Sequence, residues 1–216
     1  KLFDVIRMDH FIGFVKNYMV PKDATDASGG RWMKGPGRKL TDALNSVLNG
    51  TTVIADDYGG KALIPGVKKL LAKTGWLDTK VLMFAFDGDP SNEHLPHNYP
   101  ENCVAYTGTH DNETIVGWWN SITAAERKLA RDYLCDHATP EEELYKCFIS
   151  LIMRSVARVC VIPMQDYMGL DNRFRMNKPS TVGTNWKWRI KKRDLTKKLQ
   201  KEIYDVTLRY GRKNWD

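Results

Sequence analysis

The chain has 216 residues, of which 42% are hydrophobic and 27% charged, and its formal net charge is +7. This size and composition predict a single domain over residues 1–216 with a substantial core. No apolar run approaches the roughly 18 residues of a membrane span, and charges interrupt the first ten residues, so we expect no membrane partner and no secretory signal.

Short apolar runs predict the strands of a sheet. In chain order they cover residues 2–6, 52–55, 81–86, 103–106 and 159–163. Near-continuous apolar character is typical of parallel strands that are buried on both faces. Helical patterns separate these runs, at residues 38–48, 64–73, 124–136 and 140–158. The alternation of strands and helices predicts a parallel α/β fold.

The C-terminal segment holds much of the positive charge. Asp194 is expected to cap a helix that places its apolar side chains on one face and its lysines on the other. The apolar positions are Leu195, Leu199, Ile203, Val206 and Tyr210. No aromatic residues interleave with the basic ones in the manner of single-strand binders, so the pattern favours a solvated helix and no nucleic-acid partner.

The cysteines are Cys103, Cys135, Cys147 and Cys160, and no two of them form a CxxC pair. We interpret them as reduced thiols of a cytosolic protein rather than as a disulfide or a metal site.

Polar or titratable residues follow every predicted strand. They are Arg7, Asp9 and His10; Asp56 and Asp57; Asp87; Thr109, His110, Asp111 and Asn112; and Gln165 and Asp166. Parallel α/β folds build their sites at the carboxyl ends of strands. One such strand end would mean little, but their repetition predicts an active site.

The motifs of several enzyme classes are missing from the sequence. There is no GxGxxG, GxxxxGK[ST], GxSxG or HExxH. His94 and His97 lie in a proline-containing loop, so we expect neither a metal nor a cofactor. Carboxylates accompanied by tryptophans remain, and this combination suits glycoside chemistry, in which two carboxyl groups flank the bond and flat rings stack on sugars. The carboxylates are Asp9, Asp56 and Asp111, and the tryptophans are Trp32, Trp118, Trp119, Trp186 and Trp188.

Long sequence blocks resemble a known family. The blocks are RMDHFIGF, GGRWMKGPG, VIADDYGG, HLPHNYPENCVAYTGTHDNET and PMQDYMGL followed by RMNKPSTVGTNWKWRI. Their order and spacing from Arg7 to Arg189 resemble the glycoside hydrolase family 77 enzymes, the 4-α-glucanotransferases or amylomaltases. The resemblance implies a (β/α)8 barrel of the TIM type, of which this chain would supply about strands 4 to 8 with their helices.

The resemblance also implies roles for individual residues. Asp9 would be the nucleophile, Asp56 would occupy the acid/base position, and Asp111 would stabilise the transition state. Substrate-binding roles are implied for Arg7, His10, Asp87, His110, Asn177 and Trp186. Asn177 is equally well explained as an ordinary turn residue, and the alternation of Trp186 and Trp188 suggests that one is buried and one touches sugar. The implied partners are maltooligosaccharides and α-glucans derived from starch or glycogen.

Two departures from the family pattern affect the expected mechanism. The family has AEDLG where this chain has Ala55-Asp56-Asp57-Tyr58-Gly59, so the acid/base carboxyl is one methylene shorter, about 1.5 Å. Asp57 would face the opposite side of the strand. The family's first three barrel strands are also missing, so we expect the remainder of the barrel to come from a longer parent chain.

These departures keep more than one function open. The first hypothesis is a 4-α-glucanotransferase that acts by retaining double displacement. The alternative is a catalytically impaired glucan-binding pseudoenzyme or fragment, and a weaker third hypothesis is an α-glucan hydrolase. A cytoplasmic location is expected, with a plastid possible if a transit peptide preceded the chain.

Overall fold

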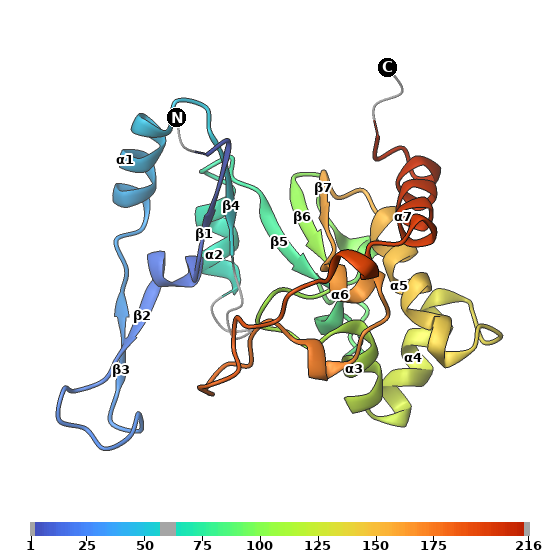
Figure 1. Cartoon of the computed structure of the whole chain (residues 1–216). Coiled ribbons are helices and arrows are strands. Elements are labelled where there is room, and N and C mark those ends of the chain that lie inside the picture. The colour runs from blue at the N-terminus through green and yellow to red at the C-terminus, as the bar shows by residue number, and fades with distance from the viewer. Residues whose placement is uncertain (1–2, 57–63, 214–216) are drawn as a thin grey trace. The chain divides into compact units, whose positions relative to one another are not determined.

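The computed structural model describes residues 3–56 and 64–213 (Figure 1). The chain divides into two compact units, residues 1–79 and 80–216. Each unit contains parallel strand pairing, so the predicted α/β class is confirmed. Among the described residues, the strands form small separate sheets and do not close into a barrel.

The first unit is built on a parallel strand pair. β1 (Val5–Met8) pairs with β4 (Thr52–Ala55), with Val5 opposite Thr52 and Met8 opposite Ala55. Leu77 adds a parallel bridge to Ile54 on the other side of β4. The helices of this unit are α1 (Arg38–Leu48) and α2 (Ile64–Leu71). The core beneath it contains Phe11, Ile12, Val53, Ala55, Val67, Leu70, Leu71 and Trp76.

An antiparallel hairpin in the first unit was not predicted from the sequence. β2 (Lys16–Met19) pairs with β3 (Arg31–Lys34), and Tyr18 lies opposite Trp32. Their rings meet edge-on with centroids 5.3 Å apart. The hairpin extends from the β1–β4 pair as the blue ribbon in Figure 1.

A three-stranded sheet has the order β5 (Asp78–Val81), β6 (Cys103–Tyr106) and β7 (Val159–Val161), and β6 and β7 are parallel. β5 spans the boundary between the units, and β6 and β7 belong to the second unit. The helices are α3 (Ile115–Ser121), α4 (Ala124–Leu134), α5 (Leu144–Met153), α6 (Met164–Tyr167) and α7 (Lys197–Arg209). The core includes an aromatic group in which the Trp118 ring lies 5.3 Å from the Phe148 ring and 5.7 Å from the Phe86 ring.

Several predicted boundaries were wrong. The strand predicted at residues 81–86 ends at Val81, because the Val81 N–H donates to the His94 imidazole at 3.1 Å and Leu82–Phe84 turn into a 3-10 helix. The last helix is capped by Thr196, which accepts from the Leu199 N–H, rather than by Asp194. The helix predicted at residues 140–158 begins as a 3-10 turn, Glu141–Glu143, and α5 stops at Met153.

Candidate active site

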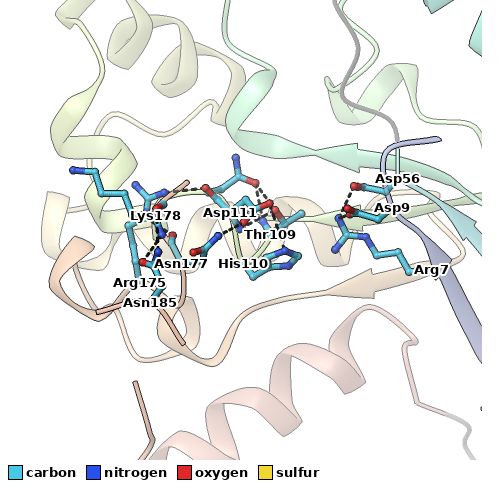
Figure 2. A network of polar contacts seen from close by, with 11 residues as sticks. Arg7, Asp9, Asp56, Thr109, His110, Asp111, Arg175, Asn177, Lys178 and Asn185 are labelled. Atoms are coloured by element: carbon cyan, nitrogen blue, oxygen red, sulfur yellow. Dashed lines mark hydrogen bonds and ion pairs between the residues drawn. The ribbon is translucent and has the colours of Figure 1, made fainter. Parts of the chain in front are cut away.

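The first group of site residues, here called the Arg7 cluster, consists of Arg7, Asp9 and Asp56. The Arg7 guanidinium lies 2.6 Å from Asp56 Oδ2 and 3.3 Å from Asp9 Oδ1. Figure 2 shows both carboxylates turned toward this guanidinium. The Asp56 side chain is 5% exposed, whereas that of Asp9 is 79% exposed. A buried carboxylate requires a partner, and Arg7 supplies one.

Backbone pairing places the two carboxylates at the same level of the sheet. The β1–β4 register continues beyond Met8 and Ala55, because the Asp56 N–H donates to Met8 O at 2.9 Å and the Phe11 N–H donates to Asp56 O at 2.7 Å. Asp9 and Asp56 are therefore the first residues after the paired segments of adjacent parallel strands. This is the position at which α/β folds carry catalytic groups.

Arg7 contacts both carboxylates, and its shorter contact is with Asp56. The substrate-binding role expected for Arg7 stays a prediction. The predicted site residue His10 follows Asp9 in a left-handed backbone conformation, with φ at 52°, and its ring lies against Gly13. The strand-end residue Asp57 lies outside the described residues.

The second group, here called the Asp111 cluster, consists of His110, Asp111, Arg175 and Asn177 and lies in the second unit. Asn177 Nδ2 donates to Asp111 Oδ1 at 2.5 Å, and His110 Nε2 lies 3.4 Å from Asp111 Oδ2. Arg175 donates from Nη2 to the Asp111 carbonyl at 2.8 Å and from Nε to the Asn177 carbonyl at 3.2 Å. Figure 2 shows these side chains converging from two separate segments, residues 109–111 and 175–177. The contact between Asn177 and Asp111 makes Asn177 more than an isolated turn residue.

Trp186 lies beside this cluster. Its ring centroid is 5.2 Å from that of the His110 imidazole, and its backbone N–H donates to the Met176 carbonyl oxygen at 2.7 Å. The backbone φ of 65° is left-handed, a conformation that costs a non-glycine residue roughly 1–2 kcal/mol. Trp186 is exposed and Trp188 half-buried. Trp186 is therefore the more accessible of the two rings.

A short turn fixes the backbone at Asp111. Asn112 Oδ1 accepts from the Thr109 N–H at 2.9 Å and from Thr109 Oγ1 at 2.8 Å. The Asp111 N–H in turn donates to Thr109 Oγ1 at 3.3 Å. His110 and Asp111 are thus presented by a closed loop rather than by a free strand end.

Asp87 does not directly follow a strand, because β5 already ends at Val81 and a 3-10 helix intervenes. Its Oδ1 accepts from the Asp89 N–H at 3.1 Å in an exposed turn. The prediction that Asp87 is a strand-end carboxylate was therefore wrong, and its sugar-binding role stays a prediction.

A cavity of about 180 Å³ and another of about 160 Å³ occur within the second unit. The smaller one adjoins the Asp111 cluster and is lined by His110, Glu113, Asp166, Arg175 and others. Burial raises the pKa of Asp166 to about 6, although hydrogen bonds from Thr107 and Ile115 oppose the shift. This site combines a cation, an imidazole and carboxylates around a concave surface, which is suited to binding hydroxyl-rich molecules.

Sequence reasoning missed Arg175. The residue occurs in the block RMNKPSTVGTNWKWRI, two positions before Asn177, but its contact with the Asp111 backbone depends on how the chain folds back. A signal was available in the spacing, since an arginine close to a predicted site residue is a natural ligand of carbonyls and carboxylates.

The remaining expectations concern metals and membranes. Among the described residues, no group of three or more His, Cys, Asp and Glu side chains could hold a metal ion. Within the same part of the chain, no helix is long and apolar enough to cross a membrane. All four cysteines are free thiols.

Comparisons with known proteins match these features. A 4-alpha-glucanotransferase from Clostridium butyricum is 41% identical over 213 residues, which cover 98% of this chain and 43% of that protein. The chloroplastic/amyloplastic 4-alpha-glucanotransferase of Solanum tuberosum is 41% identical over 214 residues, or 98% of this chain and 36% of that protein. The chain thus spans about two-fifths of the length of these relatives.

Solved structures agree with this result. An amylomaltase from Streptococcus agalactiae in complex with acarbose matches with a TM-score of 0.89 and 33% identity, over 98% of this chain and 42% of that one. The fold is therefore that of part of an amylomaltase. The family model for glycoside hydrolase family 77, described as 4-alpha-glucanotransferase, matches residues 1–196. The chain belongs to this family of 4-α-glucanotransferases.

Proposed function

We propose that this chain is the C-terminal part of the catalytic domain of a 4-α-glucanotransferase, contributing about strands 4 to 8 of a (β/α)8 barrel. The donor and acceptor are maltooligosaccharides or α-glucans from starch or glycogen. The supporting observation is the Arg7 cluster, in which two carboxylates leave adjacent in-register strands and share one guanidinium. The protein works in the cytoplasm, or in a plastid if a transit peptide precedes it.

The reaction is a double displacement. Asp9 attacks the anomeric carbon and forms a glycosyl ester, while Asp56 donates a proton to the departing glycosidic oxygen. Asp56 then removes a proton from the acceptor hydroxyl, which attacks the same carbon and releases Asp9. The net configuration is retained because two inversions occur. Exposure of Asp9 leaves it open to a substrate, as a nucleophile requires.

The Asp111 cluster binds the sugar ring in this proposal. Carboxylate and imidazole groups accept and donate hydrogen bonds to ring hydroxyls, and these bonds strengthen as the oxocarbenium-like state forms. Trp186 offers an exposed ring for stacking on a sugar face. Asn177 and Arg175 hold Asp111 through its side chain and its backbone carbonyl.

One observation favours the alternative, a glucan-binding protein with impaired catalysis. Asp56 is shorter than the family's glutamate and lies 2.6 Å from Arg7, whereas an acid catalyst must reach the leaving oxygen. In this case the chain binds glucans and turns them over slowly. An α-glucan hydrolase is the third possibility, in which water replaces the acceptor sugar.

The test is a chromatographic product ladder from maltotriose, made with the unmodified chain, Asp9→Asn and the control Asp42→Asn. Asp42 is an exposed helix residue paired with Arg38 at 3.2 Å, so its variant should behave like the unmodified chain. Glucose together with longer oligosaccharides indicates transfer, whereas glucose and maltose alone indicate hydrolysis. Equal ladders from the unmodified chain and Asp9→Asn would refute the role of Asp9.

A binding measurement separates the proposal from the alternative. Calorimetry with acarbose, the molecule in the Streptococcus agalactiae complex, reports binding without turnover. Acarbose binding with no ladder would support the impaired protein. A folded chain that shows neither binding nor a ladder would refute both functions for this chain alone.

A further inference from the structure

Asp166 is a buried carboxylate that the proposed reaction does not use. It lies in the short helix α6 after β7 and is 1% exposed. Its Oδ2 accepts from Thr107 Oγ1 at 2.6 Å, and its Oδ1 accepts from the Ile115 N–H at 2.8 Å. Both carboxylate oxygens are therefore engaged by donors from a different part of the chain.

The two donors bracket the segment that carries His110 and Asp111. Thr107 directly follows β6, and Ile115 is the first residue of α3. The segment between them, residues 108–114, contains both site residues. One side chain thus holds the beginning and the end of the loop on which the Asp111 cluster depends.

The surroundings make these two contacts costly to lose. Asp166 lines the smaller cavity together with His110 and Arg175. A buried carboxylate is stable only when hydrogen-bonded, and burial has already raised the pKa of Asp166 to about 6. A purely structural contact between β6 and α3 could be made by apolar side chains at lower cost.

We propose that Asp166 is a positioning residue for the Asp111 cluster, because it fixes the two ends of the segment that presents His110 and Asp111 to the sugar. The sugar-binding part of this inference rests on the proposed function. The contacts within the loop set its internal shape, and Asp166 sets its place relative to β6 and α3. A displacement of about 1 Å at a catalytic centre can lower the rate about 100-fold.

The variants separate position from mere stability. Asp166→Ala removes both contacts. Asp166→Asn keeps the shape, with its amide oxygen accepting from Ile115 and its amide group donating to the Thr107 hydroxyl. Thr107→Val removes one contact and leaves the other.

The matched control is Asp136→Ala. Asp136 also accepts from a threonine hydroxyl and a backbone N–H, from Thr139 Oγ1 at 2.6 Å and Thr139 N at 2.9 Å. It lies between α4 and α5, away from residues 108–114 in sequence. It reproduces the chemistry of the Asp166 contacts without bracketing the site loop.

The readout is the imidazole resonance of His110 in a carbon–proton NMR spectrum. The chain has five histidines, and the His110 signal is identified by its disappearance in His110→Gln. We expect Asp166→Ala to shift this signal while that of His97 stays in place. Asp166→Asn and Asp136→Ala should leave it unshifted, and Thr107→Val should shift it less than Asp166→Ala does.

Transfer from maltotriose provides the second readout. We expect about a 100-fold lower kcat for Asp166→Ala and near-normal turnover for Asp166→Asn. An unshifted His110 signal in folded Asp166→Ala would overturn the proposal; if that variant does not fold, an unshifted signal in Thr107→Val would overturn it. A shifted signal without transfer by the unmodified chain would refute transfer by this chain alone and would leave the positioning role of Asp166 intact, since the NMR readout requires no turnover.

Discussion

The substitution Asp56→Glu tests how the length of one side chain limits the reaction. Glutamate extends the carboxyl group about 1.5 Å further from the β4 backbone. A misplacement of about 1 Å costs about 100-fold in rate, so we expect at least about a 100-fold faster transfer by the glutamate variant. In the proposed reaction, the longer side chain would carry the carboxyl from its 2.6 Å contact with Arg7 toward the leaving oxygen.

The same substitution has a cost in stability. Asp56 is 4% exposed, and an extra methylene in a well-packed site destabilises by about 1–3 kcal/mol. We therefore expect Asp56→Glu to unfold at lower urea concentration while it reacts faster. Opposite changes in stability and activity are the signature of a carboxyl that has been extended into a working position.

The assay is the maltotriose product ladder, normalised to folded protein by circular dichroism. Asp42→Glu serves as the control, because it lengthens an exposed aspartate on α1 and should change nothing. A ladder from the unmodified chain with no gain in Asp56→Glu would refute the length argument. If both proteins are folded and silent, side-chain length is not the limit, and transfer requires the longer protein.

Three further outcomes follow from buried groups. Arg7→Ala should lower the free energy of unfolding by about 3 kcal/mol, because it leaves Asp56 buried without the guanidinium; adding Asp56→Asn should restore part of the loss in urea titrations. The pKa of Asp166 in the folded state is about 6, above its usual 3.8, so the Asp166 carboxyl keeps its proton to a higher pH in the folded state than in the unfolded state. The free energy of unfolding should therefore fall by about 2 kcal/mol between pH 4 and pH 6, and Asp166→Asn should lack this contribution when both are titrated with urea at each pH. Gly117→Ala should destabilise α3 by about 1–3 kcal/mol instead of stabilising a helix, because the new Cβ would lie 2.0 Å from Asn172 Oδ1; in thermal denaturation, the double variant with Asn172→Ala should be no less stable than Asn172→Ala alone.

Much of the fold could be predicted because buried strands and helices leave recognisable patterns of apolar residues in the sequence. The strand at residues 103–106 was predicted to the residue, and all of its positions are buried. α1 was also predicted to the residue, and Gly50 just after it fits the usual end of a helix. The α3 helix was missed, because its seven residues are mostly buried and show no polar face.

The hairpin of β2 and β3 could not be predicted in this way. Its strands are largely exposed, so no apolar alternation marks them. It is held by the contact between Tyr18 and Trp32 and by Gly30, where an added Cβ would lie 2.4 Å from the Tyr18 ring. A pairing of rings across strands depends on register, which a single sequence does not specify.

The site was predicted unevenly for a similar reason. Asp9 and Asp56, which directly follow strands, and Asp111, in the loop after β6, could be named from the sequence. The partners that hold them could not, since Arg175 and Asp166 reach their targets from segments more than fifty residues further along the chain. The structure divides the chain into two compact units. The prediction that residues 1–216 form a single domain stays a prediction.

The backbone pairing between β1 and β4 sets the relative positions of the two carboxylates along the strands. Asp9 and Asp56 are level with each other because of backbone pairing, not because of the length of chain between them. The intervening hairpin and loops can therefore lengthen or shorten during evolution, or in a designed variant, without changing that alignment. A single residue inserted within either strand, by contrast, would turn the following carboxylate to the other face of the sheet.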